Sequence, residues 1–123
     1  MSDVVVTVPV KQWSRWLEEG DLPGDRPTGR QYSFSVPTAP RDLFRGDRVY
    51  IVCNGKLRGY APLVSIVQGT VVPRGVRMTG WLLIREGGAV AVTIPRVFVP
   101  RRGFVYRWWP RDMETPFPDW KTL

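Results

Sequence analysis

The sequence predicts an α+β fold: a small mixed or antiparallel β-barrel of about six strands with one or two short helices. Short apolar runs recur along the chain and are separated by turns rich in Gly, Pro, Asn and Asp, as in strands joined by hairpins. One segment near the N-terminus instead repeats its apolar residues at the helical period. The 123 residues fit one domain, 1–123, whose proline-broken tail (110–123) is expected to wrap the surface with Phe117 and Trp120 as anchors.

A strand and a helix are expected at the N-terminus. The run DVVVTV (3–8) is typical of a buried strand, and 9–19 is predicted to be helical because Val10, Trp13 and Leu17 fall on one face. Trp13 is assigned to the core, whereas Trp16 lies beside the apolar stripe and is a candidate for stacking on a base. Downstream we expect a loop (20–30), an alternating strand (31–36) and a turn with one short helix from Pro40 to Phe44 (37–47).

Residues 44–64 predict a β-hairpin. Asn54–Gly55 between two apolar runs is a strong signal for a type I′ turn. A two-residue turn places Tyr50 opposite Gly59, where the tyrosine ring covers the bare glycine backbone. Glycine inside a strand marks a bend, a bulge or the close approach of another group. We therefore expect Gly59 to let the second strand bend and close a small barrel.

Arg58 and Tyr60 flank this glycine. In the same register both side chains project from the face opposite Tyr50, so they form a candidate ligand pair. The arginine suits a phosphate or the face of a ring, and the tyrosine suits stacking. The alternative is a salt bridge of Arg58 that the tyrosine covers.

Three further strands are predicted in the second half of the chain. In the last of them Phe104, Tyr106 and Trp108 share one face, which we assign to the core because three aromatic residues alternate there. Arg107 and Trp109 then lie on the opposite face and form a second candidate ligand pair, through cation–π contact or stacking. The three strands span 76–84, 89–99 and 104–109, and Pro95 makes the second of them an edge strand or breaks it.

The charge of the chain favours an anionic partner. Lys and Arg number 18 against 11 Asp and Glu, which gives a net charge of +7, and all but three of the cations are Arg. Arginine forms bidentate contacts with phosphate and stacks on flat rings. We therefore expect an anionic partner such as nucleic acid, with Arg101 and Arg102 as phosphate contacts in a turn. The alternative is that GC-rich coding accounts for the arginine excess.

Several reaction classes are excluded by residues that the chain lacks. Without histidine, Ser-His-Asp and Cys-His catalysis and histidine metal sites are impossible, and neither GxxxxGK[ST] nor GxGxxG occurs. Cys53 is the only cysteine, so we expect no internal disulfide, a buried small hydrophobe and a cytoplasmic protein. No apolar run approaches the roughly 20 residues of a membrane span. We expect no metal, no cofactor and no membrane contact.

The order of the predicted elements resembles a known superfamily. A strand, a helix, a loop and a short strand precede GDRVYIV…GKLRGYAPLV, and the aromatic GFVYRWWP follows a long hairpin. Over roughly residues 4–110 this pattern is similar to the PUA-like superfamily, and within it to the ASCH and EVE/YTH-type domains. The resemblance implies a small pseudobarrel with one or two helices at its mouth and a pocket for RNA, a modified base or a nucleotide. It therefore favours RNA over DNA, or a nucleotide, as the partner.

The resemblance also implies where this pocket opens: between the strand–helix junction (Thr7 to Lys11), the 30–34 segment, and Arg58–Tyr60. Gln31 carries a donor and an acceptor that suit a base edge, and Tyr32 or Tyr60 suits stacking. The ligand-binding residues that we predict are Arg30, Gln31, Tyr32, Arg58, Tyr60, Trp16, Arg107 and Trp109.

Three functions stay open at this stage. We favour a binding module without catalysis, because the sequence contains no recognisable cluster of catalytic residues. The first alternative is a small hydrolase of the ASCH type acting on a nucleoside or RNA. The second is a protein-interaction domain that uses an exposed tryptophan patch. The hydrolase would draw its catalytic groups from Lys11 or Lys56, Glu18 or Glu19, and Tyr32 or Tyr60.

Overall fold

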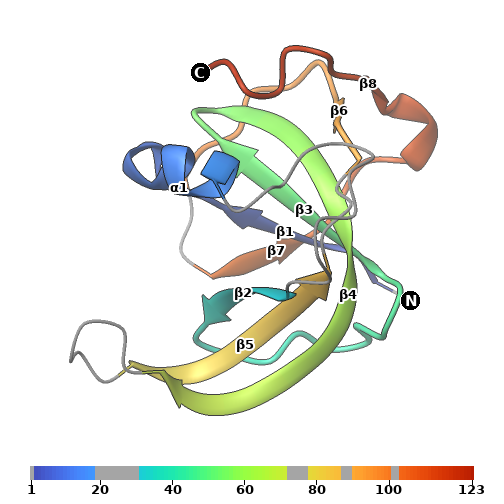
Figure 1. Cartoon of the computed structure of the whole chain (residues 1–123). Helices are drawn as coiled ribbons and strands as arrows, with labels where there is room; N and C mark the ends of the chain where they lie inside the picture. The colour runs from blue at the N-terminus through green and yellow to red at the C-terminus, as the bar shows by residue number, and fades with distance from the viewer. Residues whose placement is uncertain (1, 19–30, 72–77, 87–89, 101–102) are drawn as a thin grey trace.

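The computed structural model describes residues 2–18, 31–71, 78–86, 90–100 and 103–123 (Figure 1). Strands make up most of their regular secondary structure, with short helical turns at two places. The elements are β1 (Val4–Thr7), η1 (Val10–Gln12), α1 (Trp13–Glu18), β2 (Gln31–Val36), β3 (Arg48–Cys53), β4 (Lys56–Val71), β5 (Met78–Glu86), β6 (Val92–Thr93), β7 (Phe104–Tyr106), η3 (Arg111–Met113) and β8 (Thr115–Pro116).

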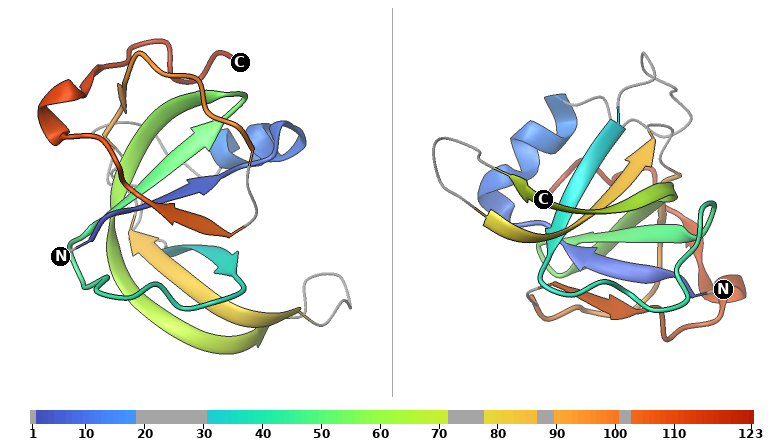
Figure 2. Two further views of the ribbon diagram at one scale, coloured as in Figure 1. Left: turned by 180° about the vertical axis from the view of Figure 1, so that it is seen from behind. Right: turned by 90° about the horizontal axis from the view of Figure 1, so that it is seen from below.

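Six strands form one curled sheet in the order β2-β5-β4-β3-β1-β7. The sheet is mixed, because β1 runs parallel to β3 whereas the other neighbours are antiparallel. The 16-residue β4 pairs first with β3 and then with β5, and its bend curls the sheet into a half-barrel (Figures 1 and 2). β6 and β8 form a separate two-stranded ribbon. The predicted β-barrel-like architecture is therefore confirmed.

The helical part of the fold is smaller than the predicted α+β class. The expected helix at 9–19 consists of a 3₁₀ turn followed by the six-residue α1, and 40–44 forms turns in place of a helix. Pro9 is extended, with ψ at 142°, so helical geometry begins only after it. Val10 is exposed, which leaves Trp13 and Leu17 as the helical contacts with the core. The described chain is mostly β, and the α+β assignment is corrected accordingly.

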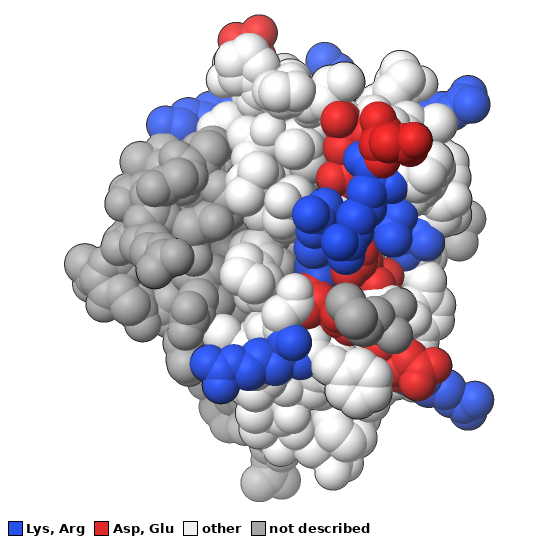
Figure 3. All heavy atoms as spheres, turned by 90° about the vertical axis from the view of Figure 1, so that its right-hand side faces the viewer, with Lys and Arg blue, Asp and Glu red and all other residues white. Residues whose placement is uncertain are grey.

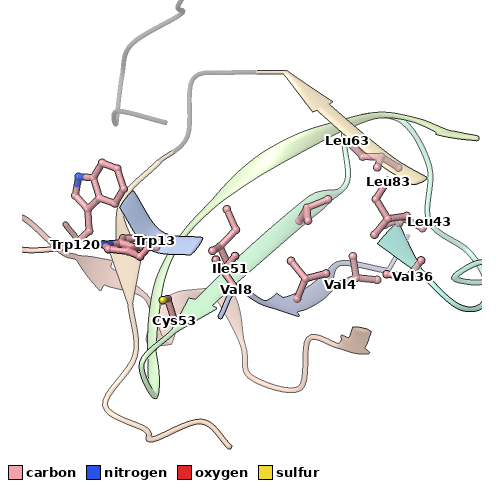
Figure 4. Close-up of a cluster of buried hydrophobic side chains, with 12 residues drawn as sticks. Val4, Val8, Trp13, Val36, Leu43, Ile51, Cys53, Leu63, Leu83 and Trp120 are labelled. Atoms are coloured by element: carbon pink, nitrogen blue, oxygen red, sulfur yellow. The ribbon is translucent and has the colours of Figure 1, made fainter. Parts of the chain in front are cut away.

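Two apolar clusters cover the two faces of the sheet. The inner cluster fills the half-barrel and includes Trp13, Cys53 and Trp120 (Figure 4). The outer cluster contains Tyr50 and Trp109 and lies under the segments that follow β5 and β7. Fully burying one large apolar side chain contributes roughly 1.5–3 kcal/mol. Because both faces of β3 are covered, every residue of that strand after the first is buried.

The β3–β4 hairpin turns at Asn54 and Gly55, as predicted. Both residues have positive φ, 51° and 75°, which a type I′ turn requires. The predicted register is correct up to Leu57, but a β-bulge then leaves Arg58 without a partner on β3. One extra residue in β4 shifts the pairing of every later residue and increases the local bend of the strand.

Gly59 is required by a close approach of another segment. A Cβ at this position would lie 2.5 Å from the carbonyl oxygen of Val90. Tyr60 and Val90 exchange two backbone hydrogen bonds of 3.0 and 2.8 Å, which hold the segment there. The predicted pairing of Tyr50 with Gly59 is wrong, because the bulge places Tyr60 opposite Tyr50, with ring centroids 5.2 Å apart.

The last predicted strand ends early, and the assignment of its two tryptophans is reversed. β7 stops at Tyr106, so the alternation of side chains does not continue to the tryptophans. Trp109 is 1% exposed in the outer cluster, whereas Trp108 is 58% exposed. Tyr106 is also exposed, and its hydroxyl bonds the main chain of Arg41. The assignment of Trp108 and Tyr106 to the core is therefore wrong.

The C-terminal tail and the 90–100 segment pack together on the sheet. The predicted strand at 89–99 contains only β6, which pairs with β8 in a tail where no strand is expected. Trp120 is buried in the inner cluster and Phe117 packs against it, which agrees with their predicted role as anchors. Figure 1 shows this tail over the tip of the β3–β4 hairpin.

Candidate functional site

A crossing segment, residues 95–100, runs over the outer face of the sheet near the hairpin tip (Figure 2, left). Its centre is held by Phe98, whose N–H donates to the carbonyl oxygen of Gly55 at 2.9 Å. The Phe98 ring packs against Trp109 with centroids 5.6 Å apart. Val97 and Val99, on either side of Phe98, are 87% and 74% exposed. The segment therefore presents apolar side chains to solvent.

Beside the crossing segment lies a hollow of about 260 Å³ with Trp108 at its edge. The Trp108 ring is supported from behind by Phe98 and Trp109, at centroid distances of 6.1 and 5.3 Å. Its side chains are mostly aliphatic or aromatic, and main-chain groups add polar surface. The lining residues are Val5, Thr7, Val52, Val97, Phe98, Val99, Gly103, Val105 and Trp108.

Two more hollows, each of about 330 Å³, adjoin the first. One shares Thr7, Val52 and Phe98 with it and extends to Val10 and the hairpin tip. The other shares Val97 and contains Lys56, Arg96 and Phe117. No Asp or Glu is among the described residues that line these three hollows. We call this surface of three adjoining hollows the Trp108 face.

Arg58 does not reach the Trp108 face. The bulge turns its side chain into the end of the half-barrel, where it is 2% exposed. Its Nε donates to the carbonyl oxygen of Cys53 at 3.0 Å. The guanidinium lies 5.6 Å from the ring centroids of both Trp13 and Phe117. Burial lowers the pKa of this arginine from its ordinary value.

Tyr60, the predicted partner of Arg58, lies in a different environment. The guanidinium of Arg48 sits 4.1 Å above its ring centroid. Arg48 also donates to the Tyr50 hydroxyl and pairs with Glu114 at 3.1 Å. The structure therefore separates Arg58 from Tyr60, with one in the inner cluster and the other against the outer cluster.

Arg107 and Trp109 belong to a charged network that ties β1 to the C-terminal tail. Arg107 pairs with Asp3 at 2.9 Å, and its Nη1 also donates to the carbonyl oxygen of Trp109. The indole N–H of Trp109 donates to Glu114 at 2.9 Å. Glu114 also accepts a hydrogen bond from the Tyr50 hydroxyl at 2.6 Å. Burial is the larger and this bond the second of the causes that raise the pKa of Tyr50 well above its ordinary value. On this face of the molecule the basic side chains lie among acidic ones (Figure 3).

The remaining predicted site residues are only partly placed. Arg30, Arg101, Arg102 and Glu19 lie outside the described residues. Trp16, Glu18, Gln31 and Tyr32 have described backbones, in α1 and β2, but no described side chains. Lys11 is exposed in η1 beside Val10. Of the residues proposed for a hydrolase, Lys56 alone lines one of the three hollows, and no described tyrosine or carboxylate lines them with it.

Sequence reasoning missed Trp108 and the crossing segment. The segment IPRVFVP places Val-Phe-Val between two prolines, a pattern that opposes a regular strand and favours an isolated extended segment. Trp108 was missed because the end of β7 depends on contacts far along the chain. Among the described residues, no three His, Cys, Asp or Glu side chains gather as a metal site would require.

The chain matches no protein-family model, no curated protein and no solved structure. No helix among the described residues is long and apolar enough to cross a membrane.

Proposed function

We propose that the protein is a non-catalytic binding module for nucleic acid or a nucleotide, and that the Trp108 face is its contact surface. The observation that carries this proposal is the exposed Trp108 ring beside a hollow, on a surface where Lys56 and Arg96 are the only charged lining residues among those that the structure describes. Aromatic rings and cations together are what surfaces for single-stranded nucleic acid use.

Trp108 suits stacking because its ring is both accessible and fixed. Stacking of a base on an aromatic side chain contributes roughly 1–3 kcal/mol and tolerates any base. Phe98 and Trp109 pack behind the indole, so little side-chain freedom is lost when a ligand binds. The adjoining hollow gives a ring stacked on Trp108 a partly enclosed place to lie.

The cations of the Trp108 face differ in their surroundings from the arginines near the first residue of β3. Arg48, Arg107 and Arg111 form ion pairs with Glu114 or Asp3. Lys56 and Arg96 are exposed and line a hollow without a described carboxylate. Lys56 and Arg96 are therefore better suited to contact phosphate than arginines that are already paired with a carboxylate.

The test is binding of a fluorescent single-stranded oligonucleotide to the whole chain at about 50 mM salt, where phosphate contacts are strong. We expect Trp108→Ala and the double variant Lys56→Ser/Arg96→Ser each to weaken binding. Arg41→Ser/Arg45→Ser removes the same charge from exposed positions before β3 and should leave binding nearly unchanged. Equal losses in the two double variants would show that net charge alone accounts for the affinity.

A protein partner is the second candidate, and the exposed valines favour it. Val10, Val97 and Val99 add aliphatic surface that nucleic acid does not need, and exposed apolar patches often mark protein interfaces. The two candidates predict different responses to salt. Apolar docking is insensitive to salt or strengthened by it, whereas phosphate contacts weaken steeply as salt rises.

A further inference from the structure

Arg58 is a buried cation with no carboxylate among its described contacts. Besides Cys53, its partners are the carbonyl oxygens of Trp120 and Thr122, which accept from Nη1 at 3.2 and 2.6 Å. Its Nη2 is buried and has no hydrogen-bond partner among the residues that the structure describes. A buried charge is costly unless it is paired and fully hydrogen-bonded, so this site holds donor capacity that the fold does not use.

The segment over Arg58 is the C-terminal strap, residues 117–122. A further carbonyl of the strap, that of Lys121, accepts the indole N–H of Trp13 at 2.8 Å. The Trp120 ring packs edge-on against Trp13, as Figure 4 shows. The strap is therefore held at this end of the half-barrel by three main-chain oxygens and the rings of Trp120 and Phe117.

The strap has little regular structure of its own. Its bonds from Trp120 N–H to Phe117 and from Thr122 N–H to Asp119 are single turns, which are marginal without the contacts that the strap makes with Arg58 and Trp13. Displacing the strap should therefore open these turns. Four residues of the strap are nevertheless exposed to solvent: Pro118, Asp119, Lys121 and Thr122. Phe117 contacts the guanidinium and also lines the hollow that contains Lys56 and Arg96. Moving this ring would join that hollow to Arg58.

We propose that Arg58 and Trp13 form an oxyanion-binding site, that the C-terminal strap occupies it as an internal ligand, and that a carboxylate or phosphate group displaces the strap. An oxyanion supplies what the carbonyls do not, namely a charge to neutralise the guanidinium and a second oxygen for Nη2. Arg58 and Trp13 offer only donors, which matches a ligand that offers only acceptors. The site is separate from Trp108 and does not depend on nucleic acid binding there.

Hydrogen exchange of the whole chain tests this proposal. Sodium phosphate and sodium acetate are titrated at constant ionic strength, with sodium chloride as the reference, and exchange is followed at the amides of Trp120 and Thr122. We expect at least one oxyanion to accelerate exchange of these amides saturably and to leave the Ile51 amide of β3 unchanged. Acceleration by phosphate alone indicates a phosphate ligand, whereas acceleration by both indicates that a carboxylate suffices.

A loosened strap provides the second arm. Trp120→Ala removes the contact of the strap with Trp13. Less of the free energy of oxyanion binding is then needed to displace the strap. The half-saturating oxyanion concentration should therefore fall roughly tenfold. Arg58→Met should abolish the acceleration of exchange by oxyanions. If Arg58→Met does not fold, the comparison of Trp120→Ala with the wild type still tests the proposal. Trp108→Ala should change nothing, which separates this site from the proposed nucleic-acid surface. Exchange that ignores both oxyanions in the wild type and in Trp120→Ala would overturn the proposal and leave Arg58 as a structural anchor.

Discussion

The Nε of Arg107 lies 2.9 Å from Oδ2 of Asp3, and this ion pair joins the start of β1 to the segment after β7. Asp3 also accepts the backbone N–H of Arg48 and both oxygens contact the guanidinium of Arg111. Burial by itself raises the pKa of Asp3, but the bonds from Arg48, Arg111 and Arg107 outweigh it and lower the pKa from 3.8. An arginine predicted as a ligand contact thus holds two segments of the chain together.

Acid should release this contact. Because the folded pKa of Asp3 is below the unfolded one, its stabilising contribution is fully present above the unfolded value of 3.8 and is lost as the pH falls through the folded value. Asp3→Asn should cost about 1.5–3 kcal/mol of unfolding free energy at neutral pH, the usual range for bonds to a charged group. Urea unfolding between neutral pH and about pH 2 measures both. A variant whose acid dependence matches the wild type would show that other carboxylates dominate.

The two neighbouring tryptophans should respond oppositely to truncation. Trp109→Ala removes a buried ring and the bond to Glu114, so we expect a loss of roughly 3–5 kcal/mol in unfolding free energy. Trp108→Ala removes a largely exposed ring, and exposed positions usually change stability by about 0.5 kcal/mol or less. Chemical unfolding of both variants checks the pair. A stable Trp109→Ala beside an unfolded Trp108→Ala would restore the opposite assignment.

The sequence predicted those parts of the fold that depend only on residues close together in the chain. Asn54–Gly55 specifies its turn through the positive φ of both residues, and the 31–36 strand was predicted with the bounds of β2. The register beyond Leu57 follows from the bulge at Arg58, where the side chain bonds residues more than sixty positions away. Periodicity assumes an unbroken strand, so it could not place Arg58 and Tyr60 on different sides of the sheet.

Gly59 should not tolerate a side chain. Gly59→Ala places a Cβ against the Val90 carbonyl and is expected to cost roughly 1–3 kcal/mol through overpacking. Gly46 is the matched control, because it also has a positive φ but no atom lies within 4 Å of an added Cβ. Gly46→Ala therefore reports the backbone cost alone. Equal losses of unfolding free energy in the two variants would contradict a specific contact with Val90.

The candidate site was less predictable than the fold because its parts come from segments without regular structure. The sequence indicated an aromatic, basic surface, but the residues chosen for it were those that regular strands would expose. In the structure Arg107 and Trp109 bond to Asp3 and Glu114, and their neighbour Trp108 is the exposed ring. Trp109 alone also packs on Tyr50 and bonds Glu114, and no local pattern reports these contacts between separate segments.

The salt dependence of nucleic acid binding should identify the phosphate contacts. For single strands each contact steepens the slope of log affinity against log salt by roughly 0.7. If Lys56 and Arg96 each contact one phosphate, Lys56→Ser/Arg96→Ser should make the slope shallower by about 1.4. Trp108→Ala should instead lower affinity by roughly 1–3 kcal/mol at every salt concentration and leave the slope unchanged, because stacking releases no counterion. Fluorescence anisotropy from about 50 to 200 mM salt separates the two effects.

The control is Arg41→Ser/Arg45→Ser, which lowers the net charge by the same amount and should keep the wild-type slope. If the slope becomes equally shallower in both double variants, the phosphate contacts do not lie specifically on the Trp108 face.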